Sequence, residues 1–351
     1  MSNETDPNAG LSGPDSRITG TEPGITSTIA DADRTRNRRI RRLLFGCTTI
    51  TVVTTVAIFA VLFDNSFHFF TEERFHHWIV GMVTDLQLYL PEQRVGLVEF
   101  LTDTEWRPSH ADDPRFGIMP LMAGTLIVTV GAAFISIPIG TATALYLSEY
   151  ASPRTRKYLK PTLEVLAGIP TIVYGFFALT FITPVVIGPF GALLGISVGR
   201  FSAISGAIVV GIMTIPMVAS ISEDAMSAVP NALRNGAYAL GASKHRVSLS
   251  VILPASISGV MASYILAVSR AIGETMAVLL AAGYSANLTA NPFEEIMTMT
   301  AYMVDATRST MLVGSVEFQS LFAVGLALFC MTLAANLLND YVKRRYREVY
   351  R

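Results

Sequence analysis

Long apolar runs separated by polar segments dominate the chain. These runs lie near residues 43–63, 119–147, 161–183, 201–221, 255–283 and 318–339. Each run can cross a bilayer, because an α-helix rises about 1.5 Å per residue and about 20 residues span the hydrocarbon core. The segment 184–200 contains two prolines and several glycines and is predicted to be a loop. The pattern therefore predicts an all-α, polytopic membrane protein with six transmembrane helices.

The composition agrees with this prediction. Hydrophobic residues make up 51% of the chain and charged residues only 15%, a balance that is typical of an integral membrane protein. Cys47 and Cys330 both lie inside apolar runs, so no disulfide framework is predicted. The sequence contains neither a phosphate-binding P-loop motif nor an H-E-x-x-H motif. We therefore expect a non-enzymatic chain that binds no cofactor itself, and any nucleotide that it depends on must bind to another subunit.

Positive charges indicate the orientation of the chain in the membrane. Lysine and arginine gather at 34–42, 154–160 and 343–351, whereas 64–117 and 284–317 carry mostly acids. With six spans, every basic segment falls on one side, which the positive-inside rule assigns to the cytoplasm. The sequence therefore predicts a multi-pass protein of the plasma membrane with both termini in the cytoplasm.

These patterns give an expected domain organisation. It comprises a disordered basic cytoplasmic tail (1–42), a first transmembrane helix (43–63), an extracytoplasmic segment (64–117), a core of five transmembrane helices (118–340) and a basic cytoplasmic tail (341–351). The first run is too long for the apolar core of a cleaved signal peptide, so a span is favoured there. The external segment has helical patterns around 72–90 and 92–102. It is either a small cap over the spans or a docking surface for an external partner, and the sequence leaves both open.

Two charged residues lie within the run 255–283. Arg270 and Glu274 are four residues apart, so one continuous helix would place them on the same face, where they can neutralise each other. Small and polar side chains share that face on a helical wheel: Ser256, Gly259, Ser263, Ala267, Ala277 and Ala281. Because ionised groups are costly at membrane depth, a functional role is favoured over a purely structural ion pair.

The chemistry of this pair suits transport of an oxyanion. A guanidinium can bind an oxyanion through two parallel hydrogen bonds, and a carboxylate one turn away can recapture the arginine and help to release the anion. Thr275 and Ser263 are further candidates for the substrate pathway, although small hydroxyl residues also serve helix packing in membranes. Glu164 follows Lys160 by four residues, and an exposed ion pair between them is favoured over a pathway role.

The polar loop 223–254 is predicted to contain two short helices. Pro230 suits a helix start, Gly241 a helix end, and Ser243 the N-cap of a second helix that carries the exposed His245. Two short helices between two spans could act as a lever, because a force on them would move both spans. Composition alone favours an ordinary interfacial hairpin.

The spacing in this loop resembles the EAA loop of ABC-importer permeases. The matching residues are Asn235, Gly236, Ala237, Gly241, Val251, Leu253 and Pro254. An asparagine replaces the glutamate of the motif and a glycine replaces one alanine. The resemblance implies that this loop, including Ala242, Ser243 and Lys244, docks on an ATPase subunit and transmits its movement.

Three further strings resemble PstC-type permeases of phosphate-specific ABC importers. They are LEVLAGIPTIVYGFFAL at 163–179, SEDAMSAVP at 222–230 and SRAIGETMAV at 269–278. The resemblance implies a type I permease fold of six spans and import of inorganic phosphate by alternating access. From the chemistry of the charged pair, we expect phosphate and Glu274 to alternate as partners of Arg270. The resemblance also implies a heterodimer with a PstA-type permease, two PstB-type ATPase subunits that bind ATP and Mg, a PstS-type external phosphate-binding protein, and no nucleic-acid partner. The alternatives are a permease for another oxyanion such as molybdate or sulfate, a channel, or a membrane signalling scaffold.

Overall fold

The computed structural model describes residues 23–70, 95–108, 110, 113–308 and 315–345. The chain divides into two compact units, Met1–Ala60 and Val61–Arg351. The predicted helix around 72–90 lies outside the described residues.

The first unit contains most of helix α1 (Pro23–Phe70). Its residues 37–70 are long and apolar enough to cross a membrane, which confirms the predicted helix over 43–63. Leu43 and Phe45 leave 70% and 72% of their surfaces exposed, as suits a helix with lipid around it. The prediction of a disordered tail up to residue 42 is wrong for 23–42, because the helix of the apolar run continues through the basic cluster into these residues.

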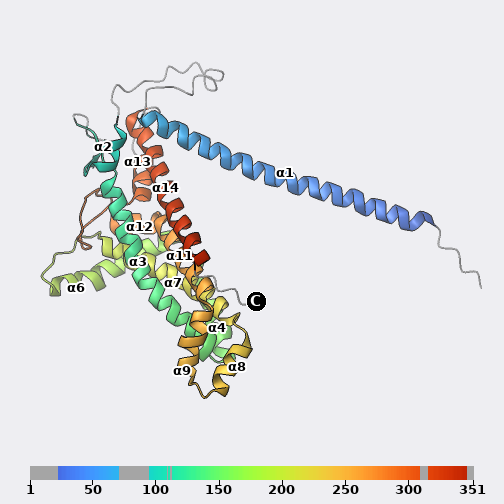
Figure 1. Ribbon diagram of the computed structural model, residues 1–351. Helices are drawn as coiled ribbons and strands as arrows, with labels where there is room; N and C mark the ends of the chain where they lie inside the picture. Colours follow the sequence, from blue (N-terminus) through green and yellow to red (C-terminus); the bar gives the residue numbers. More distant parts are fainter. Residues whose placement is uncertain (1–22, 71–94, 109, 111–112, 309–314, 346–351) are drawn as a thin grey trace, which may run out of the picture. The chain divides into compact units, whose positions relative to one another are not determined.

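The second unit is almost entirely helical. Its first elements are α2 (Leu97–Thr102), β1 (Trp106–Arg107), β2 (Arg115–Phe116), α3 (Met119–Leu145), the π-helical turn η2 (Tyr146–Tyr150), α4 (Pro153–Ala167), α5 (Thr171–Phe177), π-helix η3 (Ala178–Ile187), α6 (Gly188–Leu193) and α7 (Ala203–Ser227). There follow α8 (Asn231–Ala239), α9 (Lys244–Val247), π-helical η4 (Ser248–Ile252), α10 (Leu253–Ala255), α11 (Ile257–Ile272), α12 (Met276–Ala282), α13 (Met299–Arg308) and α14 (Val316–Arg345). Within this unit, α4, α8 and α9 lie at one end and α2 and α13 at the other (Figure 1).

The number of spans agrees with the sequence, but two boundaries differ. The described residues contain five helices that could each cross a membrane, and six if the pair 244–255 and 257–272, bent by 72°, is one span. The predicted span 161–183 is wrong: α4 ends at Ala167, and the span runs over 171–193. Pro170 causes the break, because it lacks an N–H and disfavours helical backbone at Ile169. The expected loop 184–200 is helical up to Leu193.

Helices α3 and α7 form the centre of this unit. They approach each other closely at two glycines of α3. A Cβ atom on Gly131 would lie 2.7 Å from Cβ of Ala207, and one on Gly140 would lie 2.7 Å from Cβ of Val218. A larger residue at either position would force the two helices apart.

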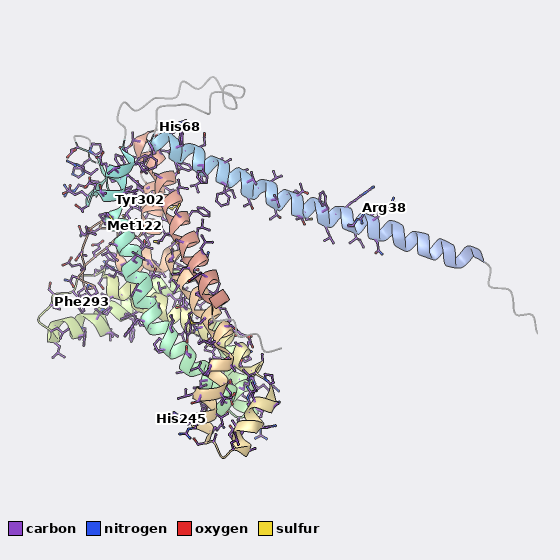
Figure 2. All side chains as sticks on the ribbon, in the orientation of Figure 1. Arg38, His68, Met122, His245, Phe293 and Tyr302 are labelled. Atoms are coloured by element: carbon purple, nitrogen blue, oxygen red, sulfur yellow. The ribbon has the colours of Figure 1, made fainter. Side chains whose placement is uncertain are left out.

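A small cap closes the end that contains α2 and α13. The strands β1 and β2 pair antiparallel, with Trp106 opposite Phe116. The Trp106 ring packs edge-on against the rings of Tyr302 of α13 and Phe116, with ring centroids 4.7 Å and 6.0 Å apart. Figure 2 labels Tyr302 at this end and His245 at the opposite end. The helical pattern predicted around 92–102 is confirmed by α2, and the hairpin and α13 were not predicted.

Candidate functional site

The run predicted as one continuous helix over 255–283 is broken in the middle. Helix α11 ends at Ile272, and α12 begins at Met276. The carbonyl oxygen of Glu274 accepts a hydrogen bond from the hydroxyl of Thr300 (2.7 Å) instead of from a helical N–H. The Glu274 carboxylate accepts the backbone N–H of Ala277 (3.3 Å), one of the free donors in the first turn of α12. These two bonds stabilise the break that follows Gly273.

The expectation that Arg270 and Glu274 share one helix face and neutralise each other is therefore wrong for this structure. Arg270 belongs to the last turn of α11, whereas Glu274 lies beyond the break and is only 7% exposed. Among the described residues, no carboxylate lies within ion-pair distance of Arg270. The guanidinium instead contacts the sulfur of Met213, at 4.0 Å from Nη2. Nearly all its donors are free to bind an anion.

Arg270 opens onto a cavity of about 290 Å³ between α4, α7 and α11. The lining is mostly apolar, and Arg270 and Glu164 are its only charged side chains; Ser220 adds a hydroxyl. A cavity with apolar walls and few polar groups is typical of a small-ligand site. The arrangement can hold a small anion on the guanidinium and offers one carboxylate as a hydrogen-bond acceptor.

The other two candidates for the substrate pathway do not line this cavity. Ser263 is fully buried: its hydroxyl donates to the carbonyl of Val260 and lies 2.7 Å from the hydroxyl of Ser222 on α7. The hydroxyl of Thr275 donates to the carbonyl of Gly273 (3.2 Å), beside the break. The stripe of small residues on α11 is packed against α7, since a Cβ on Gly259 would lie 2.4 Å from that of Ala225. In this conformation the stripe serves helix packing.

Basic residues of α4 are joined to acidic residues near the end of α7. Glu223 has no exposed surface, and its carboxylate accepts hydrogen bonds from Arg156, from Nζ of Lys160 (2.7 Å) and from the Ser227 hydroxyl (2.8 Å). Lys160 also pairs with Asp224. Burial lowers the pKa of Lys160, but the bonds to Asp224 and Glu223 outweigh this effect and raise the pKa above its ordinary value.

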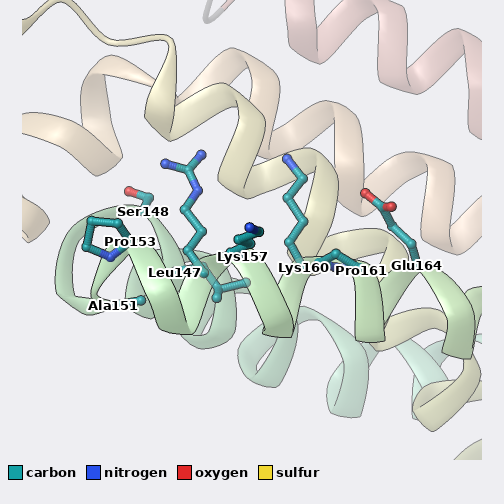
Figure 3. Close-up of a pocket in the computed structure, with 9 residues that line it drawn as sticks. Leu147, Ser148, Ala151, Pro153, Lys157, Lys160, Pro161 and Glu164 are labelled. Carbon is teal, nitrogen blue, oxygen red and sulfur yellow. The ribbon is translucent and has the colours of Figure 1, made fainter.

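The expected ion pair between Lys160 and Glu164 is therefore wrong, because Lys160 pairs with α7. Glu164 lines both the cavity at Arg270 and a second, more open one of about 490 Å³ beside Arg156, Lys157 and Lys160. In Figure 3 the side chains of Lys160 and Glu164 extend from the same side of α4. Sequence reasoning missed the pairing of α4 with α7. The acidic pair Glu223–Asp224 at the end of an apolar run was the available signal for it.

The two short helices predicted in the loop 223–254 are confirmed. Helix α8 follows Pro230, Gly241 adopts a positive φ of 79°, and α9 follows Ser243. None of the residues of α8 is buried, and Leu240, next to it, is 90% exposed. Of the EAA-like positions, Asn235 and Gly236 are exposed, and so are Gly241, Ser243, Lys244 and Pro254; Ala237, Ala242, Val251 and Leu253 are half-buried. The loop thus presents an uncovered surface at one end of the unit (Figure 1).

Comparison with known proteins places this arrangement among transport proteins. A family model described as binding-protein-dependent transport system inner membrane component matches residues 136–348. A probable ABC transporter permease protein, YqgH of Bacillus subtilis, is 37% identical over 72% of this chain and 79% of its own length. Phosphate transport system permease proteins PstC are also similar: that of Haemophilus influenzae is 33% identical over 68% of this chain and 79% of its own, and that of Mesorhizobium japonicum is 31% identical over 70% and 78%.

A solved structure supports the fold. A bacterial ABC transporter involved in the import of the acidic polysaccharide alginate superposes with a TM-score of 0.57. The superposition covers 90% of this chain and 99% of the other, at 14% sequence identity.

Proposed function

Because this chain belongs to the family of binding-protein-dependent transport system inner membrane components and is the permease subunit of an ABC importer, we propose that it imports inorganic phosphate by alternating access. The observation that carries the proposal is the guanidinium of Arg270, which opens onto a small cavity and has no carboxylate partner among the described residues. The printed names of the PstC relatives support phosphate as the anion.

Arg270 is the group that binds the anion. A guanidinium binds two phosphate oxygens at once, and the charge-assisted bonds are strong in apolar surroundings. Glu274 begins the segment just past Gly273, within four residues of Arg270 in the sequence. In the transport cycle, rotation at Gly273 brings the Glu274 carboxylate to the guanidinium, so that it replaces the departing anion. Thr275, beside the same glycine, adjusts with this rotation.

Glu164 selects phosphate over fully ionised oxyanions. At neutral pH inorganic phosphate keeps at least one O–H, whereas sulfate and molybdate keep none. An ionised carboxylate can only accept hydrogen bonds. Glu164, which shares the cavity with Arg270, therefore accepts a hydrogen bond from the O–H of phosphate and repels an oxyanion that has no donor.

The energy for transport comes from ATPase subunits, and an external binding protein delivers the anion, as in ABC importers generally. We propose that these partners are two PstB-type ATPase subunits that bind ATP and Mg, a PstA-type permease that completes the pathway, and a PstS-type phosphate-binding protein. The loop 223–254 docks on an ATPase subunit on the cytoplasmic side, where both termini also lie. Its exposed side chains support this role.

Uptake by the complete complex tests the proposal. Purified complex in liposomes, supplied with ATP inside and the binding protein outside, should accumulate labelled phosphate and leave labelled sulfate and molybdate outside. The tagged chain should also copurify with an ATPase whose activity rises when the binding protein is added. Accumulation of sulfate or molybdate in preference to phosphate would refute phosphate as the substrate. Absence of a copurifying ATPase would favour a channel or a signalling scaffold.

A further inference from the structure

The two short helices of the loop 223–254 contact the end of α3 in space, although α7 and α11 are their neighbours in sequence. Arg234 of α8 reaches Glu149 in the π-helical turn η2, with Nη2 and Nε at 3.1 and 3.3 Å from the same carboxylate oxygen. One residue further along η2, the ring of Tyr150 lies 4.9 Å from the ammonium of Lys244 of α9. Both short helices therefore attach to adjacent residues of one turn.

The ion pair between Arg234 and Glu149 is well shielded from water. Their side chains are only 15% and 7% exposed. The guanidinium also donates to the carbonyls of Met226 and Val229 at the end of α7, the first at 2.8 Å. Ser148 donates a further hydrogen bond to Glu149. Arg234 therefore fixes α8 to the ends of α3 and α7 at the same time.

Packing contributes little to holding α8, because none of its residues is buried and Ala237 is only partly buried against its neighbours. Below it lies a small apolar cluster that joins the three transmembrane helices: Ala144 of α3, Met226 and Val229 at the end of α7, Val247 and Ile252 of the loop, and Val260 of α11. The ion pair connects the exposed helix to this cluster. A buried pair of this kind contributes little net stability relative to apolar side chains, so its use is geometric.

We propose that the Glu149–Arg234 ion pair is a positioning contact that transmits movement of the coupling loop to α3, with η2 as the receiving turn. The inference rests on the proposed function, in which an ATPase subunit moves this loop. When the ATPase subunits close, α8 moves and Arg234 carries Glu149 with it. The receiving turn η2 is π-helical, and single π-helical turns within α-helices are frequently found at functional sites. The movement reaches the cavity at Arg270 through the close contact of α3 with α7.

Uncoupling of ATP hydrolysis from uptake tests this inference. Arg234→Gln and Glu149→Gln should each lower the phosphate accumulated per ATP hydrolysed by at least about tenfold, or ~1.4 kcal/mol, while ATP hydrolysis stays close to the wild-type rate. The exchanged pair, Arg234→Glu with Glu149→Arg, should recover part of the lost ratio, because it restores the ion pair but not the hydrogen bonds from position 234 to the carbonyls of Met226 and Val229. Arg154→Gln is the matched control: Arg154 is an exposed cation of α4 that forms no ion pair among the described residues, so the ratio should not change.

An unchanged ratio in both single variants would overturn the inference, as would failure of the exchanged pair to recover any coupling in an assembled complex. A merely structural role would lower hydrolysis and uptake together and leave their ratio constant. Should the wild type accumulate another anion in place of phosphate, the proposed substrate is wrong. The same ratio, measured with that anion, then still decides the inference.

Discussion

The carboxylate of Glu164 offers the sharpest test of substrate selection. The substitution Glu164→Gln keeps the size of the side chain and removes its charge. An uncharged amide can donate as well as accept hydrogen bonds, so it can bond to a fully ionised oxyanion that the carboxylate repels. We therefore expect the variant to lose discrimination between phosphate and sulfate.

The size of this effect follows from the cavity. Arg270 provides the same attraction for both anions, and Glu164 is the only other charged side chain in the lining. A hydrogen bond to a charged group contributes about 1.5–3 kcal/mol, and about 1.4 kcal/mol corresponds to a tenfold change in affinity. The ratio of phosphate to sulfate uptake should fall roughly 10- to 100-fold in Glu164→Gln, mainly because sulfate uptake rises.

The assay compares initial rates of labelled phosphate and sulfate uptake in liposomes that contain the complete complex, with a binding protein able to deliver each anion. Glu164→Asp is the matched control, because it keeps the charge and shortens the side chain by one methylene. It should retain most of the discrimination. If Glu164→Gln leaves the ratio of the two uptake rates unchanged, the Glu164 carboxylate does not select phosphate through a hydrogen bond from its O–H, and the argument for selectivity fails.

Three further predictions concern packing and charge. Gly259→Val should lower the thermal stability of the purified complex by about 1–3 kcal/mol, because a Cβ at position 259 would lie 2.4 Å from Cβ of Ala225. The control Gly46→Ala should leave the stability unchanged, because a Cβ at position 46 would meet nothing within 4 Å. Equal unfolding midpoints for the two variants would refute the close contact at Gly259. Glu223→Gln should destabilise the complex by about 1–3 kcal/mol in a denaturation experiment. This is less than the roughly 3–5 kcal/mol that is lost when a fully buried charge is left without its partner, because the side chain of Lys160, which loses Glu223, is 26% exposed. The folded protein raises the pKa of Lys160 above its ordinary value of 10.5. The stability that the Lys160 ion pairs contribute is therefore fully present below pH 10.5 and is lost as the pH rises through the pKa of Lys160 in the folded protein. The stability difference between wild type and Lys160→Gln should thus be constant at neutral pH and shrink in strong base, and a difference that grows there would contradict the ion pair.

The features that the sequence predicted correctly depend on local signals. Pro230, Gly241 and Ser243 fix the ends of α8 and α9 through backbone geometry that each residue favours by itself, and the structure places both helices accordingly. The apolar runs likewise predict spans because their length alone must match the bilayer.

The features that the sequence did not predict depend on distant partners. The break after Gly273 is stabilised by Thr300, which is 26 residues from Glu274 in the chain, so helical spacing wrongly placed Arg270 beside Glu274. Lys160 likewise finds its carboxylates on α7, 63 and 64 residues away, instead of at Glu164. In each case the neighbour in sequence was a plausible partner, and only the packing of separate helices decided otherwise.

Uptake by the variant Arg270→Ala tests the central claim most directly. The complete complex with this substitution should assemble and hydrolyse ATP, yet its initial rate of phosphate uptake should fall at least about 100-fold, since two charge-assisted hydrogen bonds of about 1.5–3 kcal/mol each are lost. Phosphate uptake at the wild-type rate by the assembled Arg270→Ala complex would contradict the account.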